Sequence, residues 1–166
     1  MDPTVPVSTG DLATQLDYAL KLRDMQSAVA SALLALDSLK EQLQQAEKTV
    51  KERLTDAPKE LGTTLVDALH QVAAMQGRLG RPPDAFRLEV GPLLAENLGS
   101  LFFSIDGANA APTGAQQGYF NELQTEFREK MTEVNGFLTK TVPQWNETLR
   151  KFGALTVVAG KTIELP

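Results

Sequence analysis

Apolar residues recur every seven positions through the first third of the chain, in residues 9–54. One series is Leu22, Val29, Leu36, Leu43 and Val50, and the second is Tyr18, Met25, Ala32, Leu39 and Ala46. Two interleaved series with this spacing place one continuous apolar seam along a helix. The pattern therefore predicts a single helix roughly 70 Å long, at about 1.5 Å per residue. Ser8 and Asp11 form a capping-box pattern at its start, with Asp in place of the usual Glu.

Two shorter helical patterns come next. The segment 55–58 separates them from the first helix, because Asp56 is suited to a cap and Pro58 to a first helical turn. The second stripe contains Leu61, Leu65, Leu69, Val72, Met75 and Leu79, and the chain is then broken by Gly77, Gly80, Pro82 and Pro83. The third pattern covers 84–108, with Phe86, Val90, Leu94, Leu98, Leu101, Phe102 and Ile105. Gly91 and Pro92 lie inside it, which leaves open whether its first part is a separate turn.

A fourth helical pattern covers residues 114–152 and follows a capping box formed by Thr113 and Gln116. Its apolar stripe is Phe120, Leu123, Phe127, Met131, Val134, Leu138, Trp145, Leu149 and Phe152. Pro143 lies inside this pattern. Because proline removes one helical hydrogen bond, we expect a kink or an interruption there.

The last residues, 154–166, differ in character from the helical patterns. The segments 156–158 and 162–165 favour β-structure, and 159–161 is suited to a turn between them. Two interpretations of this tail stay open. In the first it folds back as a hairpin onto the first and fourth helices, and in the second it docks with a preceding domain and is left partly exposed. An isolated hairpin is only marginally stable, which favours the docking role.

The lengths of these elements predict an all-α fold. We expect an antiparallel four-helix bundle with two long outer helices, two shorter inner ones and a short β-prone C-terminal tail. The short pair would lie beside one half of the long pair, which leaves the other half as a two-helix stalk with both chain ends at its tip. In this division residues 1–8 are a linker from a preceding domain, 9–153 are the helical bundle, and 154–166 are an extended tail or hairpin.

Composition narrows the possible partners. The net charge of -5 and the scattered Lys and Arg residues argue against nucleic acid, whose phosphates require a basic patch. The absence of cysteine excludes disulfides and thiolate metal sites. No stretch approaches the roughly 20 apolar residues that span a bilayer, so we expect no membrane insertion. Residues 1–6 lack the basic region and apolar run of a signal peptide, so an export signal would lie on a longer parent chain.

His70 is the only histidine, and Asp67 precedes it by one helical turn. A Ser-His-Asp site would need a nucleophile on a Gly-x-Ser-x-Gly elbow, which the sequence lacks. The chain also lacks the paired Glu-x-x-His motifs of a di-iron bundle. A structural role is therefore expected for this histidine.

Carboxylate pairs occur on the fourth helical pattern, where Glu126, Glu129 and Glu133 lie one turn apart among Arg128 and Lys130. Residues at this spacing are neighbours on the surface of a helix. Glycoside hydrolysis requires two acids that face a sugar cleft, one of them in an apolar pocket. A solvated charged face is the expected interpretation.

Three further groups of residues have simple structural interpretations. Trp145 lies on an apolar stripe, so core packing is expected rather than carbohydrate stacking. The glycines do not form a phosphate loop, because no strand precedes them and no Gly-Lys-Ser/Thr follows; they are Gly77, Gly80 and Gly91. The glutamines expected to face solvent are Gln42, Gln44 and Gln45. We therefore predict no catalytic, cofactor-binding or metal-binding residue in this chain, and no cofactor.

Two stretches carry a resemblance to a known family. The first consists of Asp2, Pro3, Val5, Ser8, Asp11, Leu12, Gln15, Leu16 and residues 20–24. The second begins at Ala111, Pro112, Thr113, Gln116, Gln117 and Tyr119, and ends at Trp145, Asn146 and Leu149. Together they resemble the C-terminal helical region of bacterial sortilin-like or BNR-repeat β-propeller proteins, often labelled glycosyl hydrolases. The resemblance covers nearly the whole chain, and its motifs are caps, a turn and a seam.

The resemblance implies a C-terminal fragment of such a protein, periplasmic or extracellular through the signal of its parent chain. The family's active residues would lie on the propeller, so none is carried over to this sequence. The expected partners are the upstream β-sandwich and β-propeller domains, while the oligomeric state is left open. We therefore expect a non-catalytic accessory or interaction domain. The alternative is a free-standing sensor or scaffold bundle.

Overall fold

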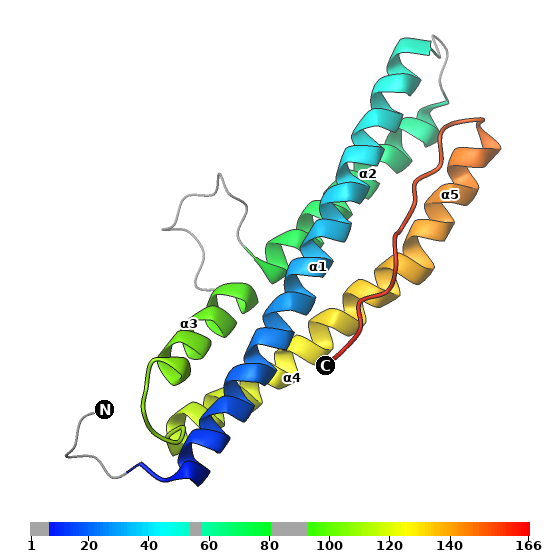
Figure 1. Ribbon diagram of the computed structural model, residues 1–166. Helices are drawn as coiled ribbons and strands as arrows, with labels where there is room; N and C mark the ends of the chain where they lie inside the picture. The colour runs from blue at the N-terminus through cyan, green and yellow to red at the C-terminus, as the bar shows by residue number, and fades with distance from the viewer. Residues whose placement is uncertain (1–6, 54–57, 81–92) are drawn as a thin grey trace.

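The computed structural model describes residues 7–53, 58–80 and 93–166, and every regular element in that part of the chain is helical. The elements are α1 (Thr9–Arg53), α2 (Lys59–Leu79), α3 (Leu94–Asp106), α4 (Gly114–Gly136), the π-helical turn η1 (Phe137–Thr141) and α5 (Val142–Lys151). Figure 1 shows that α1 runs the length of the molecule, and that α4, η1 and α5 form a second rod beside it. The predicted all-α class is confirmed. Among the described residues, no helix is both long and apolar enough to cross a membrane.

The two short helices follow each other along α1 instead of lying side by side (Figure 1). The Gln76 amide donates to Asp37 at 2.6 Å, which joins the end of α2 to the middle of α1. The Gln15 amide donates to the Ile105 carbonyl at 2.7 Å, which joins the start of α1 to the end of α3. The expected two-helix stalk is therefore wrong, because α2 and α3 between them cover both halves of α1. Since α2 and α3 run in the same direction, α5 ends far from the start of α1.

The core is formed by the predicted stripes. In α1 the buried seam residues are Leu22, Met25, Val29, Ala32, Leu36, Leu39, Leu43, Ala46 and Val50. Tyr18 is half-buried and packs edge-on against Phe120 of α4, with the ring centroids 4.8 Å apart. In the described part of the chain, no polar or charged residue is classed as buried. The hydrophobic effect is therefore the main stabilising force, at roughly 25 cal/mol per Å² of apolar surface removed from water.

Two predicted helix starts are confirmed in atomic detail. The Ser8 N–H donates to Asp11 Oδ2 at 3.0 Å, and the Asp11 N–H donates to Ser8 Oγ at 3.1 Å. The Thr113 N–H donates to Gln116 Oε1 at 2.8 Å, and the Gln116 N–H donates to Thr113 Oγ1 at 3.2 Å. Each reciprocal pair satisfies N–H groups that the first helical turn leaves without a partner.

The other predicted starts agree less well. Pro58 occupies the N-cap position of α2, while the expected cap, Asp56, lies outside the described residues. Helix α3 is observed from Leu94, whereas the apolar pattern placed its start at Asp84. The intervening residues, with Phe86, Val90, Gly91 and Pro92, also lie outside the described part of the chain.

The interruption expected at Pro143 is confirmed, and it takes the form of the wider turn η1. The Val142 N–H donates to the Phe137 carbonyl, five residues back instead of four. Proline has no N–H and its ring collides with the carbonyl four residues earlier, so a widened turn is a low-cost way to continue the helix. Beyond it, Trp145 packs edge-on against Phe137 with the ring centroids 5.1 Å apart.

Two leucines of α1 provide a direct check of the core. Leu36 is 0% exposed and Leu34 is 70% exposed. We expect Leu36→Ala to lower the free energy of unfolding by about 2–5 kcal/mol, because a buried cavity is added to the loss of apolar burial. Leu34→Ala, the matched control, should change it by less than about 0.5 kcal/mol. Urea unfolding followed by circular dichroism measures both, and equal losses would mean that α1 presents a different face to the core.

The Asp11 carboxyl provides a check of the first cap. Hydrogen bonds from the Ser8 hydroxyl and then the Ser8 N–H hold the pKa of Asp11 below its ordinary value. A lowered pKa means that the cap stabilises the folded state above the ordinary pKa, and that this contribution is lost as the pH falls through the lowered one. We expect Ser8→Ala to raise the pKa of Asp11, measured by carboxyl ¹³C NMR titration. Thr14→Ala, in the next turn, should leave it unchanged.

Candidate functional site

The last residues, 154–166, run back along the helices as an extended segment, which we name the tail. Gly153 reverses the chain: its N–H donates to the Arg150 carbonyl at 3.0 Å, and the Ala154 N–H donates to the Leu149 carbonyl at 2.9 Å. This is the Schellman arrangement, and its residue of positive φ, here +67°, is best supplied by glycine. Figure 1 shows the tail (red) descending beside α5 and η1 toward α4, with α1 on its other side.

Of the two forms left open for residues 154–166, an extended tail or a hairpin, the hairpin is not observed. The segments 156–158 and 162–165 form no paired strands, and Gly160, at φ +75°, bends the chain without reversing it. The tail does fold back onto the first and fourth helical patterns, as one of the two interpretations proposed. Val157 is 3% exposed and Ile163 packs against the core, whereas Val158 is 71% exposed. One face of the tail, with Val157 and Ile163, therefore packs against the core, and the other face, with Val158, is exposed to solvent.

Three side-chain amides take the place of a neighbouring strand. Each accepts a hydrogen bond from the N–H of one tail residue and donates one to the carbonyl of the same residue. Asn146 of α5 pairs in this way with Val157 at 2.8 and 2.7 Å. Gln42 of α1 pairs with Val158 at 2.8 and 3.2 Å. Asn135 of α4 pairs with Ile163 at 2.7 and 2.9 Å.

We name these residues the amide clamps and the space that they border the tail groove. Because each clamp forms its hydrogen bonds to the tail with backbone atoms, it holds an extended chain independently of the side chains of that chain. The two clamps on α4–α5 are eleven residues apart, and the tail residues that they hold are six apart. Eleven helical residues span about 16 Å and six fully extended residues about 20 Å. The bend at Gly160 takes up the difference.

The tail does not fill its groove. An open hollow of about 640 Å³ lies between tail residues 161–166 and α1, which contributes Asp24, Ser27, Ala28, Ser31 and Ala35. A second hollow of about 300 Å³ lies at Pro166, and its lining includes Met25 of α1 and Phe127 of α4. Unfilled space therefore remains in the groove beside residues 161–166 of the tail.

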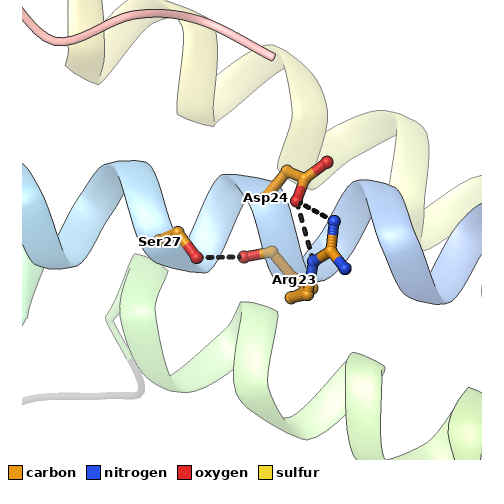
Figure 2. Close-up of polar contacts among 3 residues, drawn as sticks. All are labelled: Arg23, Asp24 and Ser27. Carbon is orange, nitrogen blue, oxygen red and sulfur yellow. Dashed lines mark hydrogen bonds and ion pairs between the residues drawn. The ribbon is translucent and has the colours of Figure 1, made fainter.

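A small polar cluster borders this end of the groove. Figure 2 shows Arg23, Asp24 and Ser27 on α1, with Arg23 Nε and Nη2 donating to Asp24 Oδ1 at 2.8 and 2.6 Å. The Ser27 hydroxyl donates to the Arg23 carbonyl at 3.0 Å. Both charged side chains are more than two-fifths exposed, and ion pairs of this kind contribute at most about 1 kcal/mol. The cluster is a polar rim and holds no arrangement of nucleophile and base.

The residues considered from sequence do not come together. His70 and Asp67 are exposed on α2, and Glu129 is exposed on α4. Glu133 pairs with Arg78 of α2 at 3.2 Å, as a contact between helices. Among the described residues, no group of three or more His, Asp or Glu side chains is placed to hold a metal ion.

Other residues considered from the sequence, a tyrosine, a tryptophan and two glutamines, are accounted for by their surroundings in the fold. The pKa of Tyr119 is raised, first by burial and then by the charges of Glu126 and Glu122. Trp145 is 7% exposed and belongs to the core, as expected. Gln44 and Gln45 are exposed, also as expected.

Gln42 was expected in solvent, and this expectation is wrong: its side chain is half-buried and holds Val158. Sequence reasoning also missed Asn135 and missed the role of Asn146. A signal was present, because asparagine is a poor helix former and these two lie three turns apart within a helical pattern. The partner that they hold is a segment without its own regular structure, which periodicity cannot identify.

Comparison with protein-family models, curated proteins and solved structures finds no match for this chain.

The clamp at Asn146 can be tested with a matched pair of asparagines. Asn146→Ala removes two hydrogen bonds to Val157, each worth about 0.5–1.5 kcal/mol. We expect hydrogen exchange of the Val157 amide, measured by NMR, to become roughly tenfold faster, since 1.4 kcal/mol corresponds to a factor of ten. Asn121→Ala, at an exposed position of α4, should leave that rate unchanged. An unchanged rate in both variants would show that the clamp does not hold the tail.

Proposed function

We propose that this chain is a non-catalytic helical interaction domain that recognises polypeptide. The observation that carries the proposal is the set of amide clamps. Gln42, Asn135 and Asn146 together make six hydrogen bonds to the backbone of an extended segment. A helical surface that supplies donors and acceptors in this arrangement binds a chain much as the edge of a sheet does.

The chemistry of the clamps favours binding over catalysis. A carboxamide offers one acceptor and two donors and does not change its charge near neutral pH. General acid–base catalysis depends on groups that exchange protons at the working pH. The clamps therefore suit a groove that holds a polypeptide and does not transform it.

We further propose that the domain is the C-terminal part of an exported β-propeller protein of glycosyl hydrolase-like type, as the family resemblance implies. The caps at Ser8 and Thr113, which belong to the residues that carry the resemblance, hold the starts of α1 and α4. The proposed partners, the upstream β-sandwich and propeller, are built of extended strands. Such strands are the class of structure that the tail groove accommodates.

A free-standing sensor or scaffold bundle is the second candidate. The observation that favours it is the open hollow of about 640 Å³ between α1 and the end of the tail. Small-molecule sites are concave and commonly enclose about 300–1,000 Å³. A sensor would use this hollow for a small ligand.

The two candidates differ in the size and location of the native protein. An antibody raised against this chain, used on fractionated cells of its source, should detect a band far above 18.0 kDa in the periplasmic or secreted fraction. A large band in the membrane fraction would favour the sensor. A band at the size of the chain alone would contradict a propeller parent.

A further inference from the structure

The outer face of α1 carries a second stripe of residues with heptad spacing, separate from the buried seam. Its members are spaced alternately four and three residues apart, as in a coiled-coil seam, and this spacing keeps them on one side of the helix. All six are exposed, and they are Leu16, Leu20, Arg23, Ser27, Ala30 and Leu34. We name these six residues the outer stripe.

The outer stripe exposes three leucines. Leu16 is 58% exposed, Leu20 39% and Leu34 70%. Residues 25–36 of α1 carry no charged side chain, so this stretch lacks the charges that usually cover the solvent face of a helix. Figure 2 looks onto the middle of the stripe, where α3 lies on one side of α1, α4 on the other, and no described helix passes in front. Exposed apolar surface of this kind marks contacts with other molecules.

The spacing of the outer stripe reads the same in both directions, as a two-fold contact requires. When two copies of α1 lie antiparallel around an axis level with residue 25, Leu16 of one copy faces Leu34 of the other. Leu20 then faces Ala30, and Arg23 faces Ser27, so that a long side chain lies opposite a short one in both layers. The stripe is therefore complementary to itself over 18 residues, or roughly 27 Å of helix.

The charges at the middle of the stripe fit the same arrangement. Within one chain Arg23 and Asp24 pair at 2.6 Å, and their side chains are 59% and 43% exposed. Around the two-fold axis, two Arg23 and two Asp24 side chains meet within one helical turn and neutralise one another. Each guanidinium can then pair with the carboxylate of the other copy. This complementarity identifies a second copy, rather than an unrelated helix, as the molecule that the stripe fits.

We propose that the outer stripe is a contact surface for a second copy of this chain, and that the two copies associate antiparallel through α1. The contact uses none of the amide clamps, so it is distinct from the interaction proposed for the tail groove. It covers one face of a single helix, which is less than the area of permanent dimers. The association is therefore reversible, with a dissociation constant on the order of 10–100 µM.

The first test is sedimentation equilibrium of the unmodified chain. The mass should rise from the 18.0 kDa of one chain at about 1 µM to twice that value at about 1 mM. Leu16→Glu with Leu34→Glu places like charges opposite each other and should keep the chain monomeric throughout. Val66→Glu, at a 41% exposed position of α2, is the matched control and should associate like the unmodified chain.

The charge pairs are tested by reversal and exchange. Arg23→Glu should weaken association about tenfold, because two ion pairs between the copies are replaced by repulsion. Arg23→Asp combined with Asp24→Arg exchanges the two charges and should restore most of the affinity. Sedimentation equilibrium measures both variants, and circular dichroism should show unchanged helix in each.

The antiparallel direction is tested with single cysteines, since the chain has none of its own. Under mild oxidation, a mixture of the Leu20→Cys and Ala30→Cys chains should form a disulfide-linked dimer. Either variant alone should not, because its two thiols would lie ten residues, or about 15 Å, apart along the helices, and a disulfide requires Cα atoms within about 7 Å.

The outcomes decide between the alternatives. A chain that is monomeric at every concentration, or a dimer that survives the two glutamates, would overturn the proposal. Rapid cross-linking of either cysteine variant by itself would show parallel association and would also overturn it. Loss of helix in the glutamate variant would show that the leucines support the fold of the single chain, and the assignment of the stripe as a contact would be wrong.

Discussion

Burial of the apolar seam of α1 is the interaction on which the rest of the structure depends. A 45-residue helix gains little from helix propensity alone, and its stability comes mainly from packing of its apolar face. Helices α2 and α3 cover the two halves of that face in turn, and α4 packs edge-on against its beginning through Tyr18 and Phe120. Helices α2, α3 and α4 therefore take their positions relative to α1, while α5 packs against α2. Few substitutions of Leu36, at the middle of the seam, would preserve this packing.

A second constraint is that backbone N–H and carbonyl groups near the core need partners. Helices satisfy theirs internally, but an extended segment cannot. The tail has no neighbouring strand, and its groups near the core are paired with Gln42, Asn135 and Asn146 instead. This arrangement explains why residues that disfavour helices lie within α4 and α5, where they lower local propensity and stabilise a distant part of the chain.

The widened turn η1 connects these two constraints. One extra residue in a helical turn rotates everything that follows by about 100° relative to an uninterrupted α-helix. Pro143 prevents regular hydrogen bonding at this point, and the turn lies between Asn135 and Asn146. The rod formed by α4, η1 and α5 thus contacts α1 through α4 and contacts α2 through α4 and α5, while two of its residues, Asn135 and Asn146, hold the tail.

The amino-acid sequence by itself determined the helical class, the apolar faces and most helix boundaries, because these depend on contacts between residues three or four positions apart. The seam of α1, both capping boxes and the interruption at Pro143 are of this kind. Tertiary structure decided how α2 and α3 lie along α1, because a heptad seam does not specify which helix covers which half. It also decided the course of the tail and the roles of Gln42 and Asn146. Their partners lie 116 and 11 residues away, and only packing of the tail against the folded helices brings those atoms together.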